Sequence, residues 1–220
     1  KIANIVVPDQ FPDFLRWMPG IERIIRYDKV PQTVDKLFAE SDTIFCLDFN
    51  TPSRITDELG EKLVAAPGRK VLIDHHLGPD VNTVLTISHP DMSSTAELVF
   101  RLIHQLGGYE DMTKNMAVTA YCGMMTDTGG FTFNSTRPEI FLIISLLLAK
   151  GIDKDKIYRN VFNTFSQSRL RLTGYVLYEK LNVLAPLHAS YYVITKEEQK
   201  RFNYIKGDAE GLVNMPLQMK

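Results

Sequence analysis

The chain has 220 residues, of which 45% are hydrophobic and 23% are charged, a composition typical of a globular protein with one large domain or two unequal ones. The formal net charge of -1 excludes a global basic field that would attract long nucleic acids, so such a partner requires a local basic patch. The longest apolar run, residues 140–149, is half the ~20 residues that span a bilayer, so we expect no membrane partner.

Apolar or β-branched runs alternate with helical patterns along the first 165 residues. This alternation predicts an α/β fold with a mostly parallel sheet flanked by helices. The run 43–47 and the helix 138–150 are almost continuously apolar, so we expect the strand to be buried on both faces and the helix to be buried as well. The strand patterns are residues 2–7, 24–27, 43–47, 70–73 and 83–87, and the helical patterns are residues 34–39, 51–66, 94–106, 113–125, 138–150 and 153–165.

Two helix starts carry clear local signals. Thr51 followed by Pro52 is typical of a cap and a first helical residue, and it predicts one helix as far as residue 66. Ser94 with Glu97 three residues later is a capping box, and we expect both side chains to serve capping rather than catalysis.

The pattern changes after a longer amphipathic helix over residues 166–181. Residues 182–184 and 190–194 alternate like antiparallel strands, and a short helix follows at 196–202. The sequence therefore predicts a first domain over residues 1–165, a connector helix and linker over 166–185, and part of a smaller α/β domain over 186–220.

The ends of the sequence indicate whether the chain is part of a longer protein, and its two cysteines indicate the redox compartment. Residue 1 is Lys, residues 2–7 already look like a strand, and residues 213–217 look like the start of another, so we expect that both ends of a larger protein are absent. No signal peptide precedes the first strand, and Cys46 and Cys122 lie in apolar runs. We expect a cytoplasmic protein with two buried, reduced thiols.

Polar residues follow three apolar elements. Asp48 ends the run 43–47, Asp74-His75-His76 ends the run 70–73, and Asp127 precedes Gly129-Gly130 after the helix 113–125. Ligands bind beyond the carboxyl ends of parallel strands, so we expect these side chains to share one rim of the sheet. Imidazole with several carboxylates favours Mn²⁺ over a zinc thiolate site, and two ions ~3.5–4 Å apart could activate water against a phosphate ester.

Each of these residues also has a structural alternative. Asp48 could cap the next helix, Asp127 could form a turn, and a His-His pair in a loop is more often a surface feature than a ligand. We interpret His104 and His188 as structural and His89 as a weak candidate for lining the site.

Together these stretches resemble the DHH phosphoesterase superfamily, and nearly the whole chain shares the resemblance. Asp48 in CLDFN resembles the second family motif, Asp74-His75-His76 the third, and Asp127 in TDTGGF the fourth, while SSTAEL between them is also similar. The most similar branch is the bacterial nano-RNase/pAp-phosphatase group, which is similar to RecJ-like exonucleases and to exopolyphosphatase-related proteins. The segment 207–214 resembles the opening of that branch's C-terminal domain.

The resemblance implies a role for each matching residue. Asp48 would bridge two Mn²⁺ ions, with Mg²⁺ or Co²⁺ as alternatives, and His75 and Asp127 would ligate one of them. His76 would hold the scissile phosphate and assist the leaving group, and Asp74 would orient an imidazole.

Two family features are absent from the sequence. The first motif, His-x-x-Pro-Asp-x-Asp, is not matched by Val7-Pro8-Asp9, and the Gly-Gly-Gly-His segment of the C-terminal domain is not found. We expect the first motif to lie upstream of Lys1. If the chain were the whole protein, its metal site would be incomplete.

We therefore expect a manganese-dependent phosphohydrolase that cuts short RNA oligonucleotides to 5′-nucleotides, or pAp to AMP, by metal activation of water. The alternatives are a pyrophosphatase or exopolyphosphatase and a catalytically inactive nucleotide-binding module. The oligomeric state is left open by the sequence, and a homodimer is one of the alternatives.

Overall fold

The computed structural model describes residues 3–219, so residues 1, 2 and 220, and with them the first residue of the strand predicted at 2–7, lie outside the described residues. The chain divides into two compact units, Lys1–Gln10 with Trp17–Arg159, and Phe11–Arg16 with Asn160–Lys220. No helix within the described part combines the length and apolar character that a bilayer crossing requires.

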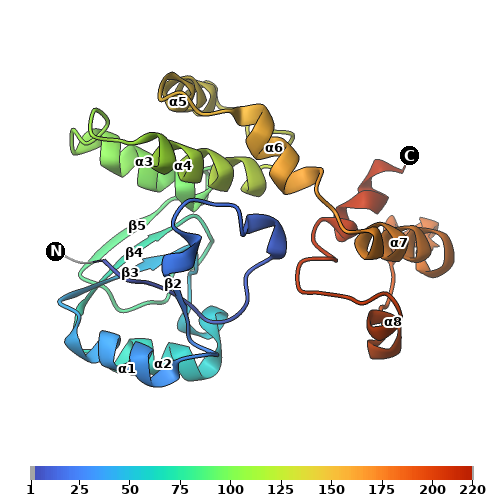
Figure 1. Cartoon of the computed structure of the whole chain (residues 1–220), viewed down its shortest axis with the longest axis horizontal. Coiled ribbons are helices and arrows are strands. Elements are labelled where there is room, and N and C mark those ends of the chain that lie inside the picture. Colours follow the sequence, from blue (N-terminus) through green and yellow to red (C-terminus); the bar gives the residue numbers. More distant parts are fainter. Residues whose placement is uncertain (1–2, 220) are drawn as a thin grey trace. The chain divides into compact units, whose positions relative to one another are not determined.

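The first unit contains two parallel sheets (Figure 1). One has the order β3 (Thr43–Leu47), β4 (Arg69–Asp74) and β5 (Leu85–Ser88), and the other pairs β1 (Ile5–Val7) with β2 (Ile24–Arg26). The register places Leu47 beside Ile73. The residues that follow β3 and β4 therefore emerge side by side at one rim.

Helices lie on both sides of the β3–β4–β5 sheet. In Figure 1, α1 (Pro31–Glu40) and α2 (Asp57–Ala65) lie on one side, and α3 (Thr95–Gln105) and α4 (Lys114–Asp127) lie on the other. α5 (Pro138–Ala149) packs beyond α4, and α6 (Lys154–Phe162) follows. This arrangement confirms the predicted α/β fold with parallel strands flanked by helices.

The prediction that the run 43–47 is buried on both faces is wrong. Cys46 is buried against Leu63 and Leu72, but the side chains of Phe45 and Leu47 are 57% and 46% exposed. Within the described residues, β3 is an edge of its sheet and hydrogen-bonds only to β4. The exposed fractions of Phe45 and Leu47 show that the face of β3 opposite Cys46 is largely uncovered.

The single helix predicted over residues 51–66 is also wrong. The chain forms a 3₁₀ turn at Pro52–Ile55 and then α2, because Thr56 adopts a positive φ of 80° between them. The Thr56 hydroxyl accepts a hydrogen bond from the Leu59 N–H and caps α2. Gly60 permits this packing, since a Cβ there would lie 2.5 Å from the Pro52 carbonyl oxygen.

The helix α5 is only half buried, contrary to the expectation for residues 138–150. The buried positions recur at the helical spacing i, i+3, i+4 and i+7, whereas Phe141 and Leu142 on other faces are exposed. The apolar run is thus wider than the face that α4 and its neighbours cover. The buried side chains are Ile140, Ile143, Ile144 and Leu147.

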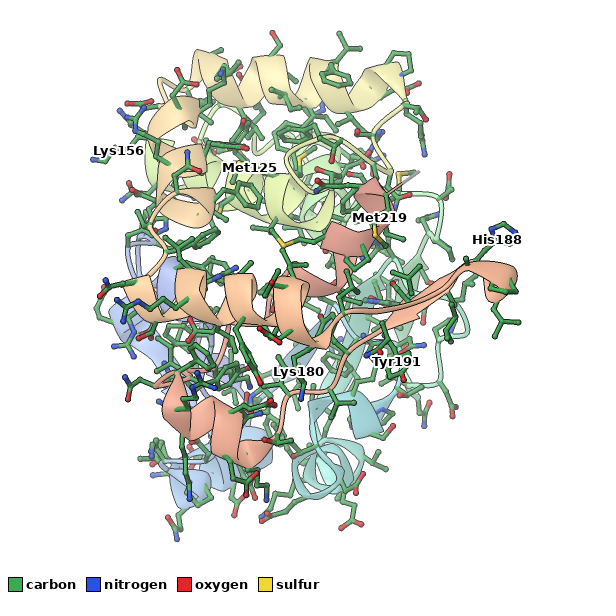
Figure 2. All side chains as sticks on the ribbon, turned by 90° about the vertical axis from the view of Figure 1, so that its right-hand side faces the viewer. Met125, Lys156, Lys180, His188, Tyr191 and Met219 are labelled. Atoms are coloured by element: carbon green, nitrogen blue, oxygen red, sulfur yellow. The ribbon has the colours of Figure 1, made fainter. Side chains whose placement is uncertain are left out.

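The second unit is built around α7 (Gln167–Tyr175), which continues into a π-helical turn at Val176–Lys180. β6 (Asn182–Leu184) and β7 (Ala189–Tyr191) pair antiparallel, and α8 (Lys196–Arg201) follows. Figure 2 shows His188 at the turn between β6 and β7. The core of the unit consists of Leu172, Val176 and Leu212.

The strand expected at residues 213–217 is not present. These residues lie in a 3₁₀ helix, Leu212–Gln218, which begins after Gly211 at a φ of 74°. Pro216 lacks the N–H that a central strand would donate, and burial of Leu212 and Pro216 fixes the helical turn instead. The remaining predicted elements differ from the observed ones only at their ends.

Both cysteines are buried free thiols, as expected. Burial raises the pKa of Cys46 and of Cys122 to about 11. Both side chains are therefore neutral core residues at ordinary pH.

Candidate functional site

The rim of the β3–β4–β5 sheet collects polar side chains from three elements. Asp48 directly follows β3, His75 directly follows β4, and Asp127 is the last residue of α4. The His75 Nε2 atom lies 3.2 Å from Asp127 Oδ2 and 3.7 Å from Asp48 Oδ1. Three residues far apart in the sequence thus place their polar atoms around one point.

Asp48 leaves the strand in a left-handed conformation, with φ at 67°. Its N–H still donates to the Ile73 carbonyl, so the chain turns immediately after the last ladder hydrogen bond. Aspartate tolerates this region better than most residues. The carboxylate does not cap the following helical turn, because its Oδ1 atom accepts a hydrogen bond from the Thr95 hydroxyl at 2.8 Å.

The tautomer of the neutral His75 ring follows from the partner of its Nδ1 atom. His75 Nδ1 lies 3.2 Å from the Met92 carbonyl oxygen, which can only accept, so Nδ1 carries the proton. In this tautomer of the neutral ring, the Nε2 atom has no proton, and its lone pair faces the carboxylates of Asp48 and Asp127. Three acceptors converge there, and this arrangement is stable only with a proton or a metal cation between them.

The environment of Asp127 also favours a positive charge at this point. Burial raises the pKa of Asp127, and the negative charge of Asp48 raises it further, whereas His75 and His76 act in the opposite direction. Ionised Asp127 is therefore costly unless a cation compensates it. Gly129 and Gly130 follow with φ values of 54° and 73° and turn the chain away from the helix end.

Asp74 and His76 form a second, tightly connected pair. The Asp74 carboxylate is fully buried, and its Oδ1 atom lies 2.8 Å from His76 Nδ1. Its Oδ2 atom accepts the His76 backbone N–H at 3.2 Å. Since the carboxylate accepts from Nδ1, the Nε2 atom of His76 is left available, and the ring is 30% exposed.

The donor set fits a divalent metal ion. Asp48, His75 and His76 each offer one ligand atom, and these atoms lie within 4.8 Å of one another. Asp127 adds a carboxylate oxygen beside His75. Mixed imidazole and carboxylate ligands suit Mn²⁺ and similar ions, and the adjacent rings of His75 and His76 are T-shaped with centroids 4.8 Å apart.

The segment that begins α3 contributes contacts that the sequence pattern did not predict. Ser94 accepts from the Glu97 N–H as expected, but the Glu97 carboxylate binds the N–H and hydroxyl of Ser93 instead of the Ser94 N–H. The capping box is therefore only half formed. Burial alone would raise the pKa of Glu97, but the Ser93 hydrogen bonds and the Arg101 ion pair outweigh it and lower that pKa.

The other histidines lie outside this cluster. The His89 backbone N–H donates to the Asp74 carbonyl while its side chain is exposed. His104 packs near the rings of Phe100 and Tyr109 on α3 and the loop after it. His188 lies in the β6–β7 turn of the second unit (Figure 2).

A family model for the DHH family, N-terminal domain, matches residues 3–124. Among curated proteins, the bifunctional oligoribonuclease and PAP phosphatase NrnA of Thermus thermophilus is 31% identical over 141 residues, which are 64% of this chain and 39% of that protein. The cyclic-di-AMP phosphodiesterase PdeA of Listeria monocytogenes is 27% identical over 203 residues, which are 88% of this chain and 29% of that protein.

A crystal structure of an exopolyphosphatase-related protein from Bacteroides fragilis has the same fold. It is 56% identical with a TM-score of 0.94, and the match covers 100% of this chain and 64% of that one. The chain thus spans about two fifths of the Thermus relative and less than two thirds of the Bacteroides protein.

Proposed function

The chain belongs to the DHH family, and we propose that it forms part of a manganese-dependent phosphohydrolase that cuts short oligoribonucleotides to 5′-nucleotides and pAp to AMP. One observation carries the proposal. His75 Nε2 faces carboxylate oxygens of Asp48 and Asp127, and such a set of acceptors binds a cation.

Asp48, His75 and Asp127 are the residues that would hold Mn²⁺, with Mg²⁺ or Co²⁺ as alternatives. When bound, the metal supplies an activated water and stabilises charge on the phosphate oxygens. Asp48 presents its carboxylate with Oδ1 already hydrogen-bonded to Thr95, and His75 presents Nε2 because Met92 binds Nδ1.

His76 is suited to act on the phosphate itself. Buried Asp74 binds its Nδ1–H and fixes the ring, which leaves Nε2 as the atom available to substrate. A protonated Nε2 can donate a hydrogen bond to a phosphoryl oxygen and then transfer its proton to the leaving oxygen. The same group can instead bind metal, since it belongs to the three-residue cluster with Asp48 and His75.

The choice of substrate rests on the relatives and on charge. The Thermus relative is named for oligoribonuclease and PAP phosphatase activity. A net charge of -1 favours a short substrate, because proteins that hold long strands commonly make roughly 6–10 phosphate contacts through Lys and Arg.

The test compares intact wild-type protein with His76→Ala in Mn²⁺. Wild type should release 5′-nucleotide from an RNA dinucleotide and phosphate from pAp, and His76→Ala should lose roughly 10²–10⁴-fold in kcat, the usual contribution of a general acid. Wild-type protein that binds Mn²⁺ and hydrolyses neither compound would overturn the proposal.

A second candidate is hydrolysis of pyrophosphate or polyphosphate, which the description of the 56% identical Bacteroides protein favours. The same metal ligands would also support hydrolysis of a phosphoanhydride bond, so only a comparison of rates on the two kinds of substrate separates the two candidate functions. Phosphate release from pyrophosphate or polyphosphate at a higher kcat/KM than nucleotide release from the dinucleotide would select this candidate.

A further inference from the structure

We propose that Thr95 is a positioning residue that fixes the Asp48 carboxylate, and that the segment Met92–Glu97, which contains it, aligns two side chains of the metal site together. The proposal rests on the function proposed above, because it assigns Asp48 and His75 to metal binding. It adds a residue whose own side chain lies outside the set that would ligate metal.

The first contact of this segment is with Asp48. The Thr95 hydroxyl donates to Asp48 Oδ1 at 2.8 Å, and Oδ1 is the oxygen that lies 3.7 Å from His75 Nε2. Thr95 is buried, whereas the Asp48 side chain is 56% exposed. An exposed carboxylate can rotate freely about its last torsion, so a hydrogen bond from a buried hydroxyl selects one orientation.

The second contact is with His75. The Met92 carbonyl, three residues before Thr95, accepts from His75 Nδ1–H and so directs the Nε2 lone pair toward the two carboxylates. A backbone carbonyl that holds the far nitrogen of a ligating imidazole is a recurrent device in metal sites. One short segment therefore sets the ring of one residue and the carboxylate of another.

The segment is itself rigidly held. Fully buried Glu97 accepts from the Ser93 N–H at 2.9 Å and from the Ser93 hydroxyl at 2.6 Å, and it forms an ion pair with Arg101. Ser94 accepts from the Glu97 N–H, which starts α3 directly at Thr95. The χ1 torsion of β-branched Thr95 is restricted in a helix, and its hydrogen bond to Asp48 Oδ1 sets the direction of the hydroxyl.

Thr95→Val tests this inference, because it keeps the shape of the side chain and removes the donor. The helix cap remains, since Ser94 provides it. We expect Mn²⁺ affinity, measured by electron paramagnetic resonance in the absence of substrate, to fall about 10-fold, the lower end for partners of metal ligands. Thr95→Ser retains the hydroxyl and should stay within about 3-fold of wild type.

The matched control is Thr119→Val on α4, where the hydroxyl binds only the Asn115 carbonyl of its own helix and the residue is exposed. This variant should bind Mn²⁺ as wild type does. Thermal unfolding of each variant separates a loss of fold from a loss of alignment.

The outcomes are distinct. Equal Mn²⁺ affinity in folded Thr95→Val and wild type would overturn the positioning role and leave the proposed function intact. A loss in both Thr95→Val and Thr95→Ser would show that side-chain packing, and not the hydroxyl, matters, and would also overturn it. Absence of Mn²⁺ binding in wild type would overturn both proposals.

Discussion

The Nε2 atom of His75 lies 3.2 Å from Oδ2 of Asp127, although one residue follows a strand and the other ends a helix. The Met92 carbonyl binds the opposite ring nitrogen, so this contact is between two acceptors when the ring is neutral. A cation bound between these two atoms would satisfy both of them, and the first prediction concerns the contribution of Asp127 to binding that cation.

Asp127→Asn should weaken Mn²⁺ binding by at least the roughly 10–100-fold that loss of an outer partner of a metal ligand costs, because the amide keeps the size of the side chain but removes its charge. Isothermal titration with Mn²⁺ measures the change. The control is Asp111→Asn, an exposed acid in the loop before α4. Unchanged affinity in Asp127→Asn would remove this residue from the metal site.

Asp74→Asn should lower kcat while Mn²⁺ affinity stays near that of wild type. The buried carboxylate binds both the ring and the backbone N–H of His76, and an amide cannot accept through both of its terminal atoms. We expect a loss of about 10–100-fold in turnover of an RNA dinucleotide, as for other outer partners of active imidazoles. A loss of Mn²⁺ binding equal to the loss of turnover would instead place His76 among the metal ligands.

Gly60→Ala should destabilise the first unit by about 1–3 kcal/mol, because the added Cβ would lie 2.5 Å from the Pro52 carbonyl oxygen. Urea denaturation followed by circular dichroism measures the change. Gly174→Ala on α7 is the matched control, since a Cβ there meets nothing within 4 Å, and it should stabilise the helix by about 0.5–1 kcal/mol. Equal stability of Gly60→Ala and wild type would contradict the close approach of the 3₁₀ turn to α2.

The second unit should lose stability in acid through Glu198. Hydrogen bonds from Lys180, the Thr195 N–H and Tyr175 lower the pKa of Glu198 to about 2. Because the folded pKa lies below the unfolded value of about 4.3, this stabilisation is present above pH 4.3 and is lost as pH falls toward 2.

Thermal unfolding between pH 2 and pH 7 tests this point with Glu198→Gln. The difference in melting temperature between wild type and variant should be largest near pH 7 and should shrink below pH 4.3. A difference that stays constant from pH 7 to pH 2 would show that the Glu198 contacts do not depend on its charge.

Much of the fold and the location of the cluster followed from the sequence. Apolar runs that end abruptly in Asp48 and in Asp74-His75-His76 indicate strands whose carboxyl ends carry polar residues, and parallel pairing then brings such ends together. Asp127 alone is ambiguous, because an acid before a glycine pair is also typical of a simple turn, and only its position after an apolar element, together with Asp48 and the Asp-His-His triplet, favours a site.

The contacts that orient these residues could not be predicted in the same way. The Thr95–Asp48 hydrogen bond joins residues 47 apart in the chain, and the pattern Ser94 to Glu97 already has a complete local explanation as a capping box. The exposure of Phe45 and of Phe141 likewise depends on which neighbours cover each face, and apolar character alone does not determine that.

The central claim is that Asp48, His75 and Asp127 bind one metal centre, and anomalous diffraction from crystals of the protein soaked in Mn²⁺ tests it most directly. We predict a manganese peak within coordinating distance of His75 Nε2 and of carboxylate oxygens of Asp48 and Asp127. Manganese bound only elsewhere, with His75 hydrogen-bonded directly to the two acids, would contradict the account.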